Sequence, residues 1–397
     1  MQEILRSIKY IKENNFYPVV RVVETGHAPV VEIEGKRVLM MSSNSYLGLN
    51  NHKKVITAAI EAAKKYGVGA GSARLLSGTL RPHIEAENAL AQLKNEEAAM
   101  LFTAGFLVNL GVIPALMKVF SIEQGHEIDK GIIFSDELNH NCIIIGAKLS
   151  GSERVIYKHL DLDDLEKKLA SYPKQRRKLV VTDGVFSLDG DIAQIDKMAA
   201  LANEYNAILM VDDAHATGVL GEHGGGTTDY FKLPSGRVPV VMGTASKGLG
   251  VSGGFVSGSK ELIDYLRISA RSYIFATAPS PIVAAAITAA VKVVHDEPEL
   301  REKLWQNRNY LADNIKRIGF STMQSKTQII PVLLGDEMRS ANFAQKLFER
   351  GIFVPAVRWP AVPLGQARLR VTVMAQHTKE QLDQFLNVIQ DLKNSKV

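Results

Sequence analysis

Short apolar runs alternate with helical patterns over more than half of the chain, and this alternation constrains the fold most strongly. Between about residues 55 and 290, β-rich runs occur at Ala99–Phe102, Gly131–Phe134, Lys178–Thr182, Ile208–Val211, Val238–Met242 and Gly254–Val256. Helical patterns between them include Ile84–Lys94, Leu162–Tyr172 and Asp196–Tyr205. Strands that alternate with helices indicate βαβ units. The sequence therefore predicts an α/β fold with a mostly parallel sheet flanked by helices, buried on both faces.

The pattern changes after Pro279. A long helical segment, Ile282–His295, is followed by the breaker Asp296-Glu297-Pro298 and by a second long helix through Ile318. The remaining chain from Ile329 reads strand, helix, irregular Pro-rich loop (residues 355–363), strand and helix. We expect a large α/β domain over residues 51–295 and a smaller C-terminal α+β domain over residues 296–397. Residues 1–50 are expected to pack on the small domain.

Charge and cysteine content exclude several classes of protein. The 47 Lys and Arg residues exceed the 42 Asp and Glu residues by five and are scattered, so we expect no nucleic-acid partner. Cys142 is the single cysteine, which excludes an internal disulfide and a cysteine-based metal site. The apolar run at residues 282–294 is shorter than the ~20 residues that span a bilayer. The amphipathic residues 1–15 lack the apolar core of a signal peptide. We expect a cytoplasmic protein with no membrane partner.

Polar residues follow five of the expected strands at the point where each strand ends. The segments are Thr103–Phe106, Ser135–His140, Thr182–Ser187, Asp212–His215 and Gly243–Lys247. Ligands of α/β sheets bind outside the carboxyl ends of the strands. Each segment is a weak signal alone, but together they place hydroxyls, a glycine, two histidines, an aspartate and a lysine on one rim. The sequence therefore predicts a single site there.

Lys247 is the most informative of these residues. It lies among Gly243, Thr244 and Ser246, which place backbone and hydroxyl donors near its amine. It is either a solvated surface lysine or a Schiff-base lysine beside a carbonyl cofactor. A pyridine cofactor also needs an acid that keeps its ring nitrogen protonated. Asp212 fits that role, because a buried carboxylate needs a cation. Helix capping or a structural ion pair is the alternative for Asp212.

An anion site is expected where a helix follows the first of these strands. The N–H groups of Gly105 and Phe106 lie at that helix start, and Thr244 adds a hydroxyl. An ordinary strand–helix turn is the alternative. His140 is a candidate to stack on a flat ring and His215 to bond a ring oxygen, although single histidines often have structural roles. Neither has the spacing of a metal site, so we expect no metal.

Two arginines stand out in the C-terminal part of the chain. Arg368 and Arg370 lie on one face of an expected strand, because side chains two residues apart point the same way. One of them is a candidate to bind a substrate carboxylate through two parallel hydrogen bonds. A surface ion pair is the alternative for either residue.

Together, these segments resemble the pyridoxal-phosphate (PLP) enzymes of the aspartate-aminotransferase fold, and specifically the α-oxoamine synthases. The resemblance runs from Arg21 to the last helix. The segments that carry it are Ser42–Leu49, Thr103–Phe106, Glu137–His140, Thr182–Asp191, Val211–His215, Gly243–Lys247 and Ala367–Arg370. The resemblance implies an aspartate-aminotransferase-like large domain, PLP as the cofactor, and a homodimer with active sites at its interface.

The resemblance also implies roles for individual residues. Lys247 would bind PLP as a Schiff base and later move the Cα proton, with His140, Asp212 and His215 as the other catalytic residues. Contacts to the cofactor would come from Gly105, Phe106, His140, Ser187, Asp212, His215, Thr244 and, across the dimer, Thr277. Contacts to the substrate would come from Arg21, Asn44, His140 and Arg370. Ala276 stands where relatives often have a serine, which removes one phosphate contact.

The implied reaction joins an amino acid to an acyl thioester, from coenzyme A or a carrier protein, and yields an aminoketone, the thiol and CO2. The most similar members join L-alanine to a pimeloyl thioester in biotin synthesis. Arg21–Glu24, Thr103–Phe106 and Val354–Arg358 support this choice, whereas Trp359-Pro360-Ala361 departs from the usual Pro-Pro-Thr. The alternatives are a ligase that joins glycine to acetyl-CoA and a serine-using long-chain synthase.

Other classes of protein also fit parts of the pattern. A PLP aminotransferase would accept a second amino acid and would not need coenzyme A. A cysteine desulfurase needs a mobile reactive cysteine, and Cys142 lies in a helix-like apolar run. A non-catalytic protein that kept the fold is disfavoured, because every catalytic position is filled.

Overall fold

A computed structural model describes residues 1–13, 17, 20–118, 120–121, 126–127 and 131–395 of the chain. The helix expected over residues 1–15 is present as α1 (Gln2–Glu13), and positions 14 and 15 lie outside the described residues. So do residues 396 and 397 of the expected C-terminal domain. Over the described residues, no helix combines the length and apolar character needed to cross a membrane.

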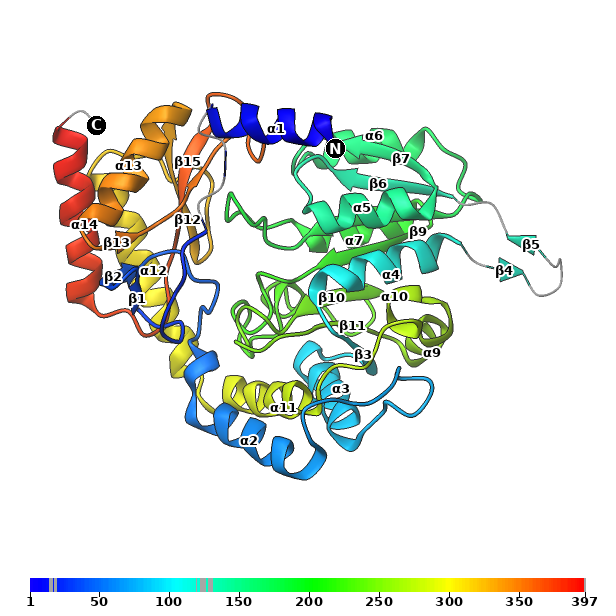
Figure 1. Ribbon diagram of the computed structural model, residues 1–397. Coiled ribbons are helices and arrows are strands. Elements are labelled where there is room, and N and C mark those ends of the chain that lie inside the picture. Colours follow the sequence, from blue (N-terminus) through cyan, green and yellow to red (C-terminus); the bar gives the residue numbers. More distant parts are fainter. Residues whose placement is uncertain (14–16, 18–19, 119, 122–125, 128–130, 396–397) are drawn as a thin grey trace.

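A seven-stranded sheet forms the centre of the protein, in the order β3-β11-β10-β9-β8-β6-β7 (Figure 1). Its strands are β3 (Ala98–Phe102), β6 (Ile132–Asp136), β7 (Glu153–Tyr157), β8 (Lys178–Asp183), β9 (Ala207–Asp212), β10 (Val240–Thr244) and β11 (Gly254–Gly258). Neighbouring strands are parallel except at β11, which is antiparallel to both β3 and β10. The expected mostly parallel α/β fold is confirmed. The edge strand β7 was not predicted, because it lacks a continuous apolar run and buries only Tyr157.

Helices cover both faces of this sheet. One face packs against α4 (Gly105–Met117), α5 (Asn141–Ser150), α9 (Lys260–Ser269) and α10 (Arg271–Ile274). The other packs against α6 (Leu162–Ala170), α7 (Ile195–Glu204), α3 (Arg81–Lys94) and α11 (Pro281–Asp296), and α2 (Lys53–Tyr66) packs on α11. Adjacent strand residues such as Val180 and Val181 belong to different hydrophobic clusters. Apolar side chains on both sides of each strand therefore fix the layered arrangement.

The C-terminal part of the chain forms a second layered unit beside the large sheet (Figure 1). Its antiparallel sheet consists of β12 (Ile329–Gly335), β15 (Ala367–Thr372) and β14 (Ala356–Val357). Its helices are α12 (Glu299–Arg317), α13 (Glu337–Glu349) and α14 (Lys379–Asn394). Strand β14 lies within the Pro-rich segment that was expected to be irregular, where pairing with β15 overrides the local sequence.

The amino-terminal segment also pairs with this C-terminal unit. Strands β1 (Val30–Ile33) and β2 (Lys36–Met40) form a small sheet in which β2 runs parallel to β13 (Ile352–Phe353). The exact division of the chain at residues 50 and 295 stays a prediction. The remaining described elements are η1 (Leu49–Asn51), β4 (Phe120–Ser121), β5 (His126–Glu127) and α8 (Thr227–Tyr230).

The loops after the parallel strands face the antiparallel sheet of β12, β14 and β15. Thr327 Oγ1 donates to the Gly190 carbonyl at 2.9 Å, and Gln328 Nε2 donates to the His215 carbonyl at 2.9 Å. The carboxyl ends of the large sheet therefore meet the second unit, and residues of both lie close together there.

Breaking the buried ion pair of Lys94 should destabilise the fold strongly. The Lys94 amine lies 2.8 Å from Asp213, and both side chains are fully buried. Removing one partner of such a pair leaves an uncompensated buried charge, so we expect Lys94→Met to lower the free energy of unfolding by about 3–5 kcal/mol in urea denaturation. Lys379→Met, which removes an exposed pair with Asp383, is the control and should leave stability nearly unchanged. Equal effects of both variants would contradict this prediction.

Candidate active site

Three buried polar residues end neighbouring strands of the large sheet. Asp183 ends β8, Asp212 ends β9 and Thr244 ends β10, and each is at most 3% exposed. Asp183 lies directly across from Asp212 in the strand register. Lys247 follows Thr244 by three residues. The candidate site therefore lies at the carboxyl ends of parallel strands, as α/β geometry predicts.

A chain of hydrogen bonds runs from Lys247 to Arg370. Nζ of Lys247 lies 2.7 Å from Nε2 of His215, and Nδ1 of His215 lies 2.7 Å from the Tyr46 hydroxyl. The Tyr46 hydroxyl donates to Oδ1 of Asn44 at 3.1 Å, and Nη1 of Arg370 donates to the same oxygen at 3.1 Å. Because Tyr46 donates its single proton to Asn44, Nδ1 of His215 is the donor to Tyr46. Nε2 of His215 is then the acceptor from Lys247.

The environment lowers the pKa of both Lys247 and His215. Burial lowers the pKa of the Lys247 amine to about 8; the charges of Asp212 and Asp183 oppose this shift, and Arg370 reinforces it. Burial, together with the nearby cations Lys247 and Arg370, holds the pKa of His215 well below its usual range. A neutral imidazole beside an easily deprotonated amine suits Lys247 for nucleophilic and general-base chemistry.

Asp212 is a buried carboxylate whose described partners are all neutral. It accepts hydrogen bonds from Nδ2 of Asn109 at 2.7 Å and from the main-chain N–H of Ala214 at 3.0 Å. The Cys142 thiol lies 3.9 Å away. An ionised carboxylate in such surroundings is stabilised by a cation. The protonated nitrogen of a pyridine ring would supply that cation.

The start of α4 offers an anion site. Ala104 caps this helix without a side-chain hydrogen bond, so the first N–H groups, those of Gly105 and Phe106, are open to a ligand. Thr244 packs against Gly105 so closely that a Cβ added there would meet the Thr244 Cβ at 3.0 Å. Thr244 gives its hydroxyl proton to the Gly253 carbonyl at 2.7 Å. In the 2.9 Å contact between the two hydroxyls, Ser246 is then the donor to Thr244, so both hydroxyl protons are used within the protein. The expected phosphate contact of Thr244 stays a prediction.

His140 is held at the start of α5 beside the acidic strand ends. Its main-chain N–H donates to Asp183 Oδ2 at 2.6 Å, and its Nδ1 accepts from the Cys142 N–H at 3.2 Å. In the neutral ring Nε2 then carries the proton. Cys142 is 3% exposed, and burial raises the pKa of its thiol. The thiol is thus not the mobile nucleophile that a desulfurase needs.

The structure distinguishes the two candidate arginines. Arg368 is 3% exposed and forms an ion pair with Asp189. Arg370 donates from Nε to the Ser187 carbonyl at 2.6 Å and from Nη1 to Asn44. Its described hydrogen-bond partners are neutral, so its charge is available for a carboxylate. Of the two arginines, Arg370 is therefore the better candidate, and its role in binding a substrate stays a prediction.

Two expected site residues lie apart from this group. Arg21 donates to both carboxylate oxygens of Glu34 at 2.8 Å, and its guanidinium lies 3.8 Å over the Phe348 ring. Thr277 is exposed and forms an isolated β-bridge with Ala73. Within the part of the chain that the structure describes, neither residue joins the Lys247 group. Their expected roles stay predictions.

Two residues of the site had no role in the sequence prediction. Asn109 is fully buried and holds Asp212; it is the one polar side chain in the apolar sequence of α4, and that contrast was the available signal. Tyr46 is also fully buried and lies between His215 and Asn44. It lies in the segment Ser42–Leu49 that carries the family resemblance, but no role was assigned to it because it is far in sequence from the strand ends.

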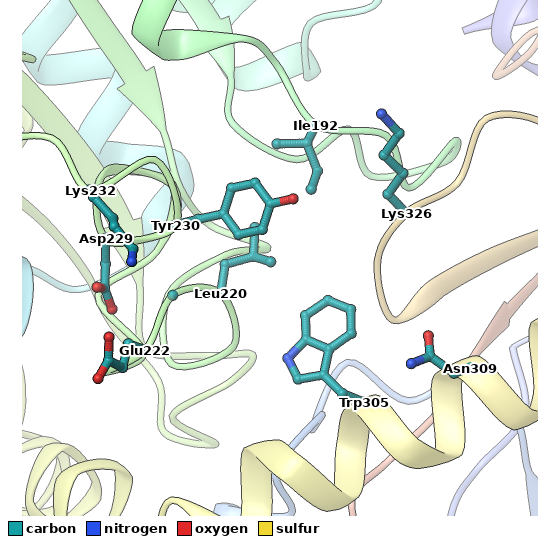
Figure 2. A pocket seen from close by; sticks show the side chains of 10 residues that line it. Ile192, Leu220, Glu222, Asp229, Tyr230, Lys232, Trp305, Asn309 and Lys326 are labelled. Carbon is teal, nitrogen blue, oxygen red and sulfur yellow. The ribbon is translucent and has the colours of Figure 1, made fainter.

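Two cavities lie away from these residues. The first, of about 390 Å³, opens between Tyr230 and Trp305, whose rings both border it (Figure 2). The second, of about 930 Å³, lies beside Asn95 and His295. Lys247 lines neither of them, so the candidate active site rests on the chemistry of the strand ends rather than on cavity size.

Comparison with known sequences places these features in a family. The family model "aminotransferase class I and II" matches residues 36–389. The 8-amino-7-oxononanoate synthase of Thermoanaerobacter pseudethanolicus is 44% identical, over 98% of this chain and 95% of its own length. The 8-amino-7-oxononanoate synthase 1 of Bacillus subtilis is 42% identical, over 96% of this chain and 94% of its own.

Solved structures agree with this result. Serine palmitoyltransferase of S. paucimobilis, solved with a bound PLP–myriocin aldimine, matches with a TM-score of 0.91 at 31% identity. The match covers 99% of this chain and 97% of that one. The 8-amino-7-oxononanoate synthase of Francisella tularensis matches with a TM-score of 0.75 at 26% identity, over 91% and 99% of the two chains.

The fold places Lys247, an amine of lowered pKa, near the buried carboxylate of Asp212. Together with the relatives, this defines a PLP-dependent enzyme of the aspartate-aminotransferase type. The relatives narrow the class further. The chain belongs to the aminotransferase class I and II family and, within it, to the α-oxoamine synthases, which are PLP-dependent acyltransferases. The resemblance seen in the sequence is thereby confirmed.

The residues present fit PLP. Asp212, a buried carboxylate with neutral partners, would hold the protonated ring nitrogen. The uncapped main-chain N–H groups of Gly105 and Phe106 at the start of α4 would hold the phosphate. Lys247 would bind the aldehyde carbon through its amine.

The pH dependence of cofactor attachment should report the lowered pKa of Lys247. Only the neutral amine attacks an aldehyde, and the pKa falls from 10.5 to about 8. The rate at which PLP-depleted protein regains its cofactor absorbance should therefore rise with pH through about 8 and level off above it. The rate for Nα-acetyl-lysine amide, the control, should keep rising with pH and level off only above ~10.4. An inflection near that higher value in the protein would contradict the prediction.

Proposed function

We propose that this protein is an 8-amino-7-oxononanoate synthase that condenses L-alanine with a pimeloyl thioester and releases CO2 and the thiol. The observation that carries the proposal is its 44% identity to the synthase of T. pseudethanolicus over nearly the whole of both chains. Lys247 and Asp212 at the carboxyl ends of the large sheet, with Arg370 on β15 of the second unit, supply the groups that this reaction needs. Biotin synthesis is the pathway that the proposal implies, in the cytoplasm.

The protein's own residues explain how the substrate is held. When bound, PLP supplies an electron sink that acidifies the Cα–H bond of an amino acid joined to it. Arg370, fixed by the Ser187 carbonyl and Asn44, binds the substrate carboxylate. Fixing that group fixes the rotation about Cα, so the Cα–H bond is directed toward Lys247.

Lys247 and His215 handle the proton. The neutral Lys247 amine takes the proton from the substrate Cα, which its lowered pKa permits near neutral pH. One N–H of the amine donates to Nε2 of His215, and this hydrogen bond orients the amine's lone pair. After decarboxylation, the protonated amine returns a proton to the same carbon.

A homodimer is part of this proposal. Thr277 is exposed in the isolated chain, and the nearby side chains of Phe275 and Leu76 are 74% and 82% exposed. Large exposed apolar side chains of this kind mark a surface that a partner covers. We infer that Thr277 reaches the phosphate site of the second copy.

A serine-using long-chain synthase is the second candidate. Its support is the backbone, which matches serine palmitoyltransferase of S. paucimobilis with a TM-score of 0.91. Sequence identity to that enzyme is 31%, against 44% to the synthase of T. pseudethanolicus, and this difference favours the first candidate.

A matrix of substrates separates the candidates. The purified holoenzyme is incubated with L-alanine, glycine or L-serine, each with pimeloyl-CoA, acetyl-CoA or palmitoyl-CoA, and the products are identified by mass spectrometry. The proposal predicts 8-amino-7-oxononanoate from L-alanine and pimeloyl-CoA as the dominant product. Product only from L-serine and palmitoyl-CoA would establish the second candidate, and product only from glycine and acetyl-CoA would establish a ligase.

Substitution of the two neighbouring arginines should have unequal effects. Arg370→Lys keeps the charge but loses the paired donors, so the KM for L-alanine should rise by about 10–100-fold, roughly the cost of a lost charge-assisted hydrogen bond. Arg368→Lys is the matched control on the same strand, and its lysine can keep the ion pair with Asp189. Steady-state kinetics measure both variants. A larger rise in KM for Arg368→Lys would contradict the assignment of Arg370.

A further inference from the structure

Residues 184–191, here called the bridging loop, follow β8 of the large sheet and contact β15, the strand that carries Arg368 and Arg370. The Ser187 carbonyl accepts from Nε of Arg370 at 2.6 Å, and the Asp189 side chain pairs with Arg368. The loop therefore holds the Nε edge of the Arg370 guanidinium group. Arg370 is the residue proposed to bind the substrate carboxylate. What fixes the loop itself then matters for substrate binding.

His159 lies between two carboxylates at the base of this loop. Its Nδ1 lies 2.9 Å from Oδ1 of Asp136, and its Nε2 lies 2.9 Å from Oδ2 of Asp191. A carboxylate oxygen only accepts hydrogen bonds, so both ring nitrogens carry a proton and the ring is a cation. Burial alone would lower the pKa of His159, but hydrogen bonds to Asp136 and Asp191 raise it to about 10.

One of these carboxylates is anchored to the sheet. Asp136 ends β6, is fully buried at its side chain, and accepts from the main-chain N–H groups of Leu138 and Leu160, both at 2.9 Å. Asp136 thus fixes Nδ1 of His159 on the sheet side. On the loop side, the His159 ring also packs edge-on against Phe186, with centroids 4.4 Å apart.

The other carboxylate belongs to the bridging loop. The Phe186 N–H donates to the Asp191 carbonyl at 3.2 Å, and the Gly190 N–H donates to the Phe186 carbonyl at 2.9 Å. These bonds close the loop on itself, so residues 186–190 move with Asp191. Oδ1 of Asp191 is buried and has no hydrogen-bond partner among the described residues, which leaves His159 as the ion-pair partner that offsets its burial.

We propose that His159 is a positioning residue for the amino-acid substrate: its cation fastens Asp191, and with it the bridging loop, so that the Ser187 carbonyl holds Arg370 toward the substrate carboxylate. The inference rests on the proposed function, because it takes Arg370 as the carboxylate-binding group. His159 touches neither the substrate nor the site of PLP. Its removal therefore affects the amino acid more than the cofactor or the thioester.

The test compares three variants of the holoenzyme. His159→Gln removes the cation, Asp191→Asn keeps the shape of its partner without the charge, and His295→Gln is the control. His295 also pairs with an aspartate, Asp296, but its side chain is 82% exposed. Four quantities are measured: the dissociation constant for L-alanine from the change in cofactor absorbance, the KM for pimeloyl-CoA, the cofactor content and the melting temperature.

We expect His159→Gln to raise the dissociation constant for L-alanine about tenfold, which corresponds to about 1.4 kcal/mol. Asp191→Asn should also raise the dissociation constant for L-alanine. The double variant should bind L-alanine no more weakly than His159→Gln alone, because each single substitution already removes the same interaction. The KM for pimeloyl-CoA should stay within about twofold of its value in the unsubstituted protein, a difference of ~0.4 kcal/mol. The cofactor content should stay close to that of the unsubstituted protein. His295→Gln should change none of the four quantities.

Two results would overturn the inference. One is an unchanged dissociation constant for L-alanine in both His159→Gln and Asp191→Asn. The other is a parallel loss of alanine affinity, thioester affinity and cofactor content with a fall in melting temperature, which would make His159 a purely structural residue. Failure of the proposed function has a different signature, since the unchanged protein itself would then show no absorbance change with L-alanine.

Discussion

The buried carboxylate of Asp212 is the constraint on which the rest of the site depends. It ends a strand in the middle of the large sheet, where both faces are covered by helices, and its described partners are a side-chain amide, a main-chain N–H and a thiol. A charge in such a place is costly unless a cation meets it. We propose that the ring nitrogen of the cofactor supplies this cation. The same low-polarity surroundings lower the pKa of Lys247 to about 8, so one environment prepares both the acid and the amine.

The site is divided between two structural layers, and a small number of polar contacts connect them. The large sheet supplies Asp212, Lys247 and the start of α4, which suit a cofactor, whereas β15 supplies Arg370, which suits an amino-acid carboxylate. The hydrogen-bond chain through His215, Tyr46 and Asn44 joins the two. The lysine amine and the guanidinium proposed to bind the carboxylate therefore belong to one hydrogen-bond network.

Much of the fold could be predicted from the sequence, because each central strand is a short apolar run followed by a polar or small residue. Asp212, Thr244 and Lys247 could be placed at one edge for the same reason. The edge strand β7 and the short β14 could not, since tertiary pairing forms them without a strong local pattern. Tyr46 was also missed, because it reaches His215 from 169 positions earlier in the chain. Strand alternation alone left Arg368 and Arg370 equivalent, and the family resemblance pointed to Arg370. The ion pair of Arg368 with Asp189 is consistent with that choice.

The most direct test of this account is the protonation state of the cofactor nitrogen. PLP labelled with 15N in its ring is bound to the protein, and the 15N chemical shift is recorded for the unchanged enzyme and for Asp212→Asn. The account predicts a protonated ring nitrogen in the unchanged enzyme across neutral pH, and an unprotonated one once the carboxylate charge is removed. An unprotonated nitrogen in the unchanged enzyme, or the same chemical shift in both proteins, would contradict it.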